Sequence, residues 1–147
     1  KPTDTQRVIR AYEVKLFTKR SIYDWFKSTR SNYENDDFFK IYIDYPRTEL
    51  IRRISDRTAD MIKKGAISEV KKFIRLKVPR TKTASKAIGI AEIREYLEKK
   101  IEISEVIEKI SIKTRQYAKR QSTWGRGNMM DWNKIKSEDL NKFLKKI

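Results

Sequence analysis

The sequence contains no cysteine and no histidine among its 147 residues. Their absence excludes disulfides, thiol nucleophiles, imidazole bases and zinc-finger sites, so any chemistry would need carboxylates, hydroxyls, lysines, arginines or a cofactor. A protein without disulfides fits a reducing compartment, and we expect a cytoplasmic location. No apolar run approaches the length that crosses a bilayer, and we expect no membrane partner.

Glycine and proline are also scarce, with four and three residues respectively. Few helix breakers and many Lys, Glu, Arg and Ile residues favour a mainly α fold. Apolar residues recur at helical spacing, and in the first predicted helix they are Val8, Ile9, Tyr12 and Leu16. The predicted helices span about 5–18, 21–27, 47–64, 67–76, 89–99, 104–124 and 137–146.

Several polar residues and one glycine stand where helices should begin or end. Thr3 or Asp4 is the expected cap of the first helix, and Ser104 is the expected cap of the long helix 104–124. Gly65 is placed to end the helix 47–64, because glycine readily adopts the left-handed conformation that follows many helices.

One strand is predicted at about 38–45, where Phe39, Ile41 and Ile43 alternate with more polar residues. A second short extended segment is predicted at 129–135. A single strand cannot satisfy its backbone hydrogen bonds alone. We therefore expect the sheet partners of the strand at 38–45 to lie outside this chain.

The net charge is +16, from 36 Lys and Arg residues against 20 Asp and Glu residues. Because the basic residues recur beside aromatic ones, nucleic acid is the expected partner, and an acidic protein is the alternative. One face of the helix 104–124 would carry Lys109, Lys113, Gln116 and Arg120.

The densest such pattern is the segment 114–126. Cations interleaved with flat aromatic faces suit an RNA backbone and its unstacked bases. The alternative is a solvated basic helix end with a tryptophan in the core. The residues concerned are Arg115, Tyr117, Lys119, Arg120, Trp124 and Arg126.

Arg57 falls among the apolar positions of the helix 47–64, three after Ile54 and four before Met61. A buried guanidinium must be paired, because an isolated buried charge is too costly. Its partner would be either Asp56 or Asp60, or else a phosphate, which the planar guanidinium binds through two hydrogen bonds.

Four segments follow one another in the order of a known family's motifs. They are 6–13 (Gln-Arg-Val-Ile-Arg-Ala-Tyr-Glu), 46–57 (with Pro-Arg at 46–47 and Arg-Ile-Ser-Asp-Arg at 53–57), 87–89 (Ala-Ile-Gly) and 114–124 (Thr-Arg-Gln-Tyr-Ala-Lys-Arg-Gln-Ser-Thr-Trp). Over nearly the whole chain these segments resemble the tRNA dimethylallyltransferases, also called tRNA isopentenyltransferases.

The resemblance implies transfer of a dimethylallyl group from dimethylallyl diphosphate to the exocyclic amine of the adenosine 3′ of the anticodon. It implies magnesium bound with the diphosphate, an anticodon stem-loop as partner, and a monomer. It assigns Arg57 to the diphosphate. It assigns the following residues to tRNA: Gln6, Arg7, Arg10, Lys86, Ala87, Ile88, Gly89, Lys119, Arg120, Gln121, Trp124 and Arg126.

The family begins with a phosphate-binding loop, Gly-x-x-x-x-Gly-Lys-Ser/Thr, followed by an aspartate that acts as general base. Neither is present in this sequence. The resemblance therefore implies that residues 1–147 are a single C-terminal portion whose strand completes a parallel α/β sheet of the P-loop type. We expect no catalytic residue and no metal ligand in this chain, and no prenyl transfer by the chain alone.

Two positions depart from the family pattern. Ile90 and Ala91 follow Gly89 where the family has tyrosine and a basic residue, which removes one ring and one cation. Gly125 precedes Arg126 where the family has a bulky residue. The alternatives to a tRNA-modifying enzyme are a non-catalytic basic helical RNA-binding module and a helical protein–protein module.

Overall fold

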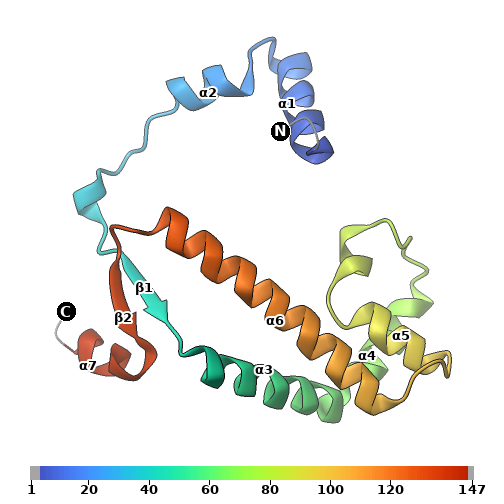
Figure 1. Cartoon of the computed structure of the whole chain (residues 1–147). Helices are drawn as coiled ribbons and strands as arrows, with labels where there is room; N and C mark the ends of the chain where they lie inside the picture. The colour runs from blue at the N-terminus through green and yellow to red at the C-terminus, as the bar shows by residue number, and fades with distance from the viewer. Residues whose placement is uncertain (1–3, 146–147) are drawn as a thin grey trace. The chain divides into compact units, whose positions relative to one another are not determined.

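The computed structural model describes residues 4–145, which form a mainly α fold with one two-stranded sheet (Figure 1). The chain divides into two compact units, one up to Phe39 and the other from Lys40 onward, and each is described by itself. The first contains α1 (Thr5–Thr18), α2 (Ile22–Ser28) and a 3₁₀ turn at Asn35–Asp37. The second contains β1 (Ile41–Asp44), α3 (Arg47–Met61), α4 (Ile67–Arg75), a 3₁₀ turn at Thr83–Lys86, α5 (Ile90–Leu97), α6 (Ile103–Asn128), β2 (Asn133–Lys136), a 3₁₀ turn at Ser137–Asp139 and α7 (Leu140–Leu144). The mainly α fold expected from the sequence is confirmed.

In the first unit, side chains near the helix ends determine where α1 and α2 begin. The Asp4 carboxylate accepts the Arg7 backbone N–H at 3.2 Å and caps α1; Thr3, the other expected cap, lies outside the described residues. Ser21 and Asp24 cap α2 reciprocally, each side chain accepting the other's backbone N–H. Because these bonds satisfy amides that the helix leaves free, each helix begins where its capping side chain stands.

The apolar stripe of α1 is exposed, and no side chain of α1 or α2 is buried. The apolar residues that recur at helical spacing, Val8, Ile9, Tyr12 and Leu16, are each at least half exposed. A hydrogen bond joins α2 to α1: the Trp25 indole N–H donates to the Thr18 hydroxyl at 3.1 Å. This contact lies at the C-terminal end of α1, so α2 leaves the stripe uncovered.

The hydrophobic core of the second unit lies where α4, α5 and the first half of α6 meet. Its fully buried side chains are Ile93 of α5 and Val106 of α6, with Ala66, Val70 and Ile110 around them. α3 packs along α6, and Figure 1 shows α6 running from the core back to the sheet. The long helix therefore joins the packed core of this unit to its sheet.

Helix boundaries in the second unit follow capping chemistry, with one correction. Gly65 adopts φ +107° between α3 and α4, so the expected helix end there is confirmed. The long helix begins at Ile103 rather than after a Ser104 cap, because Glu105 accepts the backbone N–H of Glu102 at 3.2 Å. The helix expected at 137–146 is a 3₁₀ turn followed by α7, and residue 146 lies outside the described residues.

The sheet pairs β1 with β2 in parallel, with Ile41 opposite Asn133 and Ile43 opposite Ile135. The expectation that the strand's partners lie outside this chain is therefore wrong for one of its edges. The partner belongs to the extended segment predicted at 129–135, and the intervening helices α3 to α6 form the crossover that parallel pairing requires.

Candidate nucleic-acid interface

The C-terminal half of α6 presents an exposed surface of cations and aromatic rings. We call it the α6 surface, and it consists of Tyr117, Lys119, Arg120, Gln121, Trp124 and Arg126, all exposed. Trp124 is 59% exposed, so the alternative of a core tryptophan is wrong. The Arg120 guanidinium lies 5.8 Å from the centroid of the Tyr117 ring, close enough for a cation–π interaction.

A hollow of about 540 Å³ opens beside this surface, between β1 and the end of α6. Aromatic and apolar side chains line most of it, and Arg120 and Gln121 contribute the polar groups. Its rings come from Tyr42, Tyr117, Trp124 and Trp132. Flat rings beside a guanidinium and an amide can hold a planar ligand by stacking and bind its edge by hydrogen bonds.

Gly125 forms part of the floor of this hollow because the Tyr42 ring packs directly on it. A Cβ at position 125 would lie 2.6 Å from Cε2 of Tyr42 and 3.3 Å from its Cζ. The helix therefore has no room for a larger side chain while Tyr42 occupies this place. The bulky residue that the family pattern has at this position would therefore collide with the Tyr42 ring where it lies here.

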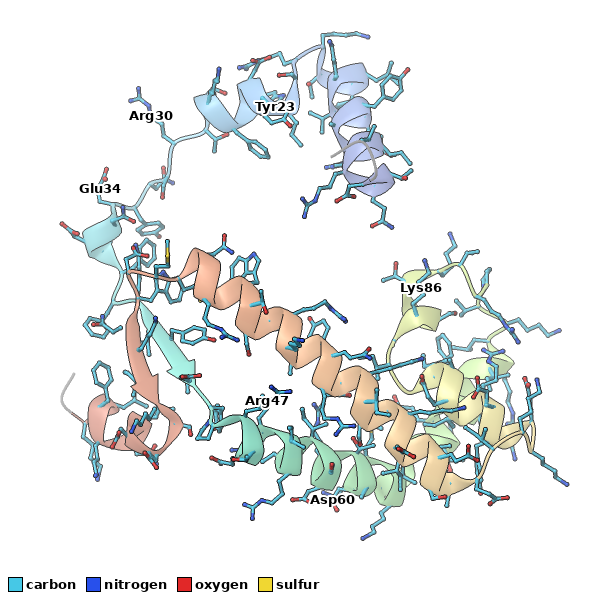
Figure 2. All side chains as sticks on the ribbon, viewed as in Figure 1. Tyr23, Arg30, Glu34, Arg47, Asp60 and Lys86 are labelled. Atoms are coloured by element: carbon cyan, nitrogen blue, oxygen red, sulfur yellow. The ribbon has the colours of Figure 1, made fainter. Side chains whose placement is uncertain are left out.

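A second group of predicted residues lies on the turn that leads into α5. Lys86, Ala87 and Ile88 are exposed, and Figure 2 labels Lys86 on this loop. Gly89 is buried with φ +106°, a conformation that L side chains rarely adopt. The turn therefore presents one cation and exposed backbone, with Gly89 as its fixed end.

A buried carboxylate fastens this turn, and the sequence reasoning missed it. Glu92 is 2% exposed and accepts the Gly89 backbone N–H through Oε2 at 2.9 Å. Its other oxygen forms an ion pair with the ammonium of Lys113 on α6. Burial by itself raises the pKa of the Glu92 carboxyl, but the hydrogen bonds from Lys113 and Gly89 outweigh it and leave that pKa below its ordinary value. The spacing of a capping residue and a glutamate three positions later was the available signal.

Lys109 and Lys113 do not extend the basic face as expected. Lys109 Nζ lies 3.0 Å from a Glu95 carboxylate oxygen, and Lys113 is paired with Glu92. The hydrogen bond to Glu95 raises the pKa of Lys109, which keeps its ammonium charged. Since carboxylates of α5 neutralise both cations, the face available to an anion begins beyond Lys113.

Arg57 is exposed, so its expected burial is wrong. The buried positions of α3 are Ile54 and Thr58, one helical turn apart, and Arg57 points away from that line. Within residues 4–145 it makes no ion pair with Asp56 or Asp60; Asp60, at the end of α3 in Figure 2, pairs with Lys64 at 3.4 Å. The guanidinium is thus accessible to an external anion.

The remaining predicted residues, Gln6, Arg7 and Arg10, lie exposed on α1 in the first unit. Arg7 pairs with Asp4 at 3.0 Å, and Arg10 pairs with Glu13 at 3.5 Å. Such exposed pairs contribute about 0–1 kcal/mol each. They can therefore open readily to a phosphate.

No group of three or more Asp or Glu side chains that could hold a metal ion occurs among residues 4–145. The carboxylates described above are engaged with lysines, arginines or backbone amides. Over the same residues, no helix has both the length and the apolar character that a membrane span requires.

Comparison with known proteins gives consistent matches. A model of the family described as "IPP transferase" matches residues 1–128. A tRNA dimethylallyltransferase of Pelagibacter ubique is 49% identical over 146 residues, covering 99% of this chain and 47% of the relative. Its counterpart in Mesorhizobium japonicum is 36% identical over 141 residues, covering 95% of this chain and 44% of the relative. The chain thus spans about half the length of the curated relatives it matches.

Two solved structures are also similar. A tRNA delta(2)-isopentenylpyrophosphate transferase from Staphylococcus epidermidis superposes with a TM-score of 0.63 at 31% identity, over 94% of this chain and 44% of that chain. A eukaryotic dimethylallyltransferase described as acting on tRNA gives a TM-score of 0.69 at 25% identity, over 97% of this chain and 38% of that chain.

Proposed function

Because the chain belongs to the IPP transferase family, we propose that it is the tRNA-binding, C-terminal part of a tRNA dimethylallyltransferase. The observation that carries this proposal is the α6 surface, where Lys119, Arg120 and Trp124 are exposed beside an aromatic hollow. The cations suit phosphates and the rings suit unstacked bases, and a single-stranded loop offers both together. The anticodon stem-loop is therefore the proposed ligand.

In the complete enzyme, the proposed reaction moves a dimethylallyl group from its diphosphate to the exocyclic amine of the adenosine 3′ of the anticodon. The turn at Lys86–Gly89 and the helix α1, with Gln6, Arg7 and Arg10, would contribute further RNA contacts. Arg57 is proposed to meet the departing diphosphate, since its guanidinium is exposed and developing negative charge needs a nearby cation.

The described carboxylates do not fit a magnesium site of their own, since no acidic cluster is present among residues 4–145. A magnesium ion bound with the diphosphate would need ligands from elsewhere in the complete enzyme. The part proposed for this chain is to bind and position the RNA, with no prenyl transfer by the chain alone.

The experiment is a binding titration of the chain with a labelled anticodon stem-loop that carries adenosine 3′ of the anticodon. The double variant Arg120→Ala, Trp124→Ala should weaken binding about tenfold or more, because base stacking on an aromatic side chain contributes about 1–3 kcal/mol and each phosphate contact adds to it. Fluorescence anisotropy at fixed salt measures the dissociation constant.

The matched control is Arg75→Ala, Leu76→Ala, which removes one exposed cation and one exposed apolar side chain at the end of α4. It should bind as the wild type does. Equal binding by the wild type and the Arg120, Trp124 variant would contradict the proposal. Binding that ignores the base 3′ of the anticodon would instead support a generic RNA-binding module.

A further inference from the structure

Glu92 occupies a position that none of the proposed RNA contacts uses. It is 2% exposed, although carboxylates are rarely so fully buried unless they are paired. One of its oxygens accepts the Gly89 N–H at 2.9 Å, and the other faces the ammonium of Lys113. A single side chain thus joins the turn before α5 to the middle of α6.

The neighbouring pair Glu95–Lys109 shows what a purely structural bridge between these helices looks like. It also links α5 to α6, at 3.0 Å, but both of its side chains are half exposed and neither bonds the turn. Glu92 differs in holding a backbone amide of the very segment, Lys86–Gly89, that is proposed to contact RNA. Removing Glu95 would therefore affect only the link between the two helices, whereas removing Glu92 would also release the turn.

The turn needs such a constraint because it contains Gly89. Its φ of +106° is open to glycine at little cost, but glycine also gives the turn many other conformations to adopt. The bond from its amide to Glu92 selects one of them. Because Glu92 is itself fixed by Lys113, the selected conformation is set relative to α6, which carries the α6 surface.

We propose that Glu92 is a positioning residue for RNA binding, which holds the Lys86–Gly89 turn in a fixed place relative to α6 through its bonds to Gly89 and Lys113. This inference rests on the proposed function, since it assigns a role within RNA binding. Glu92 itself touches no RNA; it determines where Lys86 and the exposed backbone of the turn meet the ligand.

The test compares binding of the same labelled stem-loop by the 147-residue chain and three variants, at a temperature where circular dichroism shows every chain folded. Glu92→Ala removes the acceptor for Gly89 and should weaken binding about five- to tenfold, the equivalent of one lost hydrogen bond. Glu92→Gln keeps a carbonyl acceptor for the Gly89 amide but turns an N–H donor toward the Lys113 ammonium, so its binding should lie between that of the wild type and that of Glu92→Ala.

Glu95→Ala is the matched control, because it removes the neighbouring α5–α6 ion pair and leaves the turn untouched. It should bind within about twofold of the wild type, even where its thermal midpoint falls. Equal losses in the Glu92→Ala and Glu95→Ala variants, or a loss in Glu92→Gln as large as that in Glu92→Ala, would overturn the positioning role.

A wild-type measurement keeps the test decisive if the Glu92→Ala variant is unfolded. In a ¹⁵N-labelled chain, the Gly89 amide resonance should follow the titration of the Glu92 carboxyl and should shift when the stem-loop is added. A resonance that the RNA leaves unmoved overturns the inference. A wild type that does not bind the stem-loop overturns the proposed function too, whereas equal binding by the wild type and Glu92→Ala overturns the inference alone.

Discussion

At the scale of single residues, Gly125 and Gly127 lie two positions apart on α6 and have different surroundings. A Cβ at Gly125 would lie 2.6 Å from the Tyr42 ring, whereas a Cβ at Gly127 has no atom within 4 Å beyond its own helix. Helical propensity favours alanine at both positions, so only the packing distinguishes them.

We predict that Gly125→Ala destabilises the chain and that Gly127→Ala does not. Forcing a methyl group against a packed ring costs about 1–3 kcal/mol, which exceeds the gain in helix propensity of about 1 kcal/mol. Gly127→Ala should be neutral or stabilising by up to that gain. Urea unfolding followed by circular dichroism gives both differences.

A double variant tests whether the Tyr42 ring causes the destabilisation predicted for Gly125→Ala. Replacing Tyr42 by leucine removes the ring atoms nearest to position 125, so the double variant Tyr42→Leu, Gly125→Ala should show favourable coupling between the two changes. Additive effects of the two substitutions would contradict the steric explanation.

Arg57 and Glu92 show how far single residues could be understood from sequence. Arg57 was expected in the interior because its spacing from Ile54 and Met61 is that of the apolar positions, but only Ile54 and Thr58 of α3 are buried. Glu92 could not be singled out from the sequence, because its partner Lys113 lies far along the chain on another element. The spacing of Gly89 and Glu92 could indicate the hydrogen bond between them, but it could not indicate that Glu92 is buried.

At the scale of elements, α5 and α6 are joined by two ion pairs of unequal exposure. The Glu92–Lys113 pair has a buried carboxylate, and the Glu95–Lys109 pair is half exposed. Hydrogen bonding holds the pKa of Glu92 below its ordinary value despite burial. A carboxyl whose pKa is lower in the folded state stabilises the fold above its unfolded pKa, and that contribution is lost as the pH falls through the folded pKa.

The stability difference between the wild type and Glu92→Gln should therefore depend on pH. We expect the wild type to be more stable at neutral pH, and we expect the difference to shrink as the pH falls below about 4, the ordinary range of a glutamate. Thermal midpoints across that range give the difference. A difference that is the same at every pH would show that the charge of Glu92 does not contribute.

The elements themselves were the most predictable part of the structure. Helical periodicity placed α1 and α3 to α6 within a few residues of their observed ranges, because each repeats its apolar positions over several turns. The pairing of β1 with β2 could not be predicted, since 88 residues separate Asp44 from Asn133 and parallel register has no local signal. The first-unit helices were placed correctly, whereas helical spacing alone could not show that the apolar stripe of α1 is exposed.

At the scale of the whole molecule, the net charge of +16 belongs mostly to the second unit: residues 40–147 carry 28 Lys and Arg against 14 Asp and Glu, whereas residues 1–39 carry 8 against 6. General attraction to a polyanion would respond equally to the loss of any exposed cation, whereas a defined surface would not. Lys119 on α6 and Lys72 on α4 are both exposed, which makes them a matched pair for separating the two effects.

We predict that Lys119→Glu weakens binding of the anticodon stem-loop much more than Lys72→Glu, although each lowers the net charge by two. Affinity should fall linearly with salt on logarithmic axes, and Lys119→Glu should make the slope shallower by about one, as expected for one lost phosphate contact. Equal losses would indicate binding by overall charge alone.

The contact between Tyr42 and Gly125 also constrains which sequences this fold accepts. Tyr42 lies on β1 and Gly125 on the last turns of α6, and the Tyr42 ring fills the space beside Gly125. A larger side chain at position 125 requires the Tyr42 ring to shift or to be replaced by a smaller side chain, so the two positions constrain each other. The Tyr42 ring also lines the hollow beside the α6 surface, so substitutions at positions 42 and 125 would change the shape of that hollow.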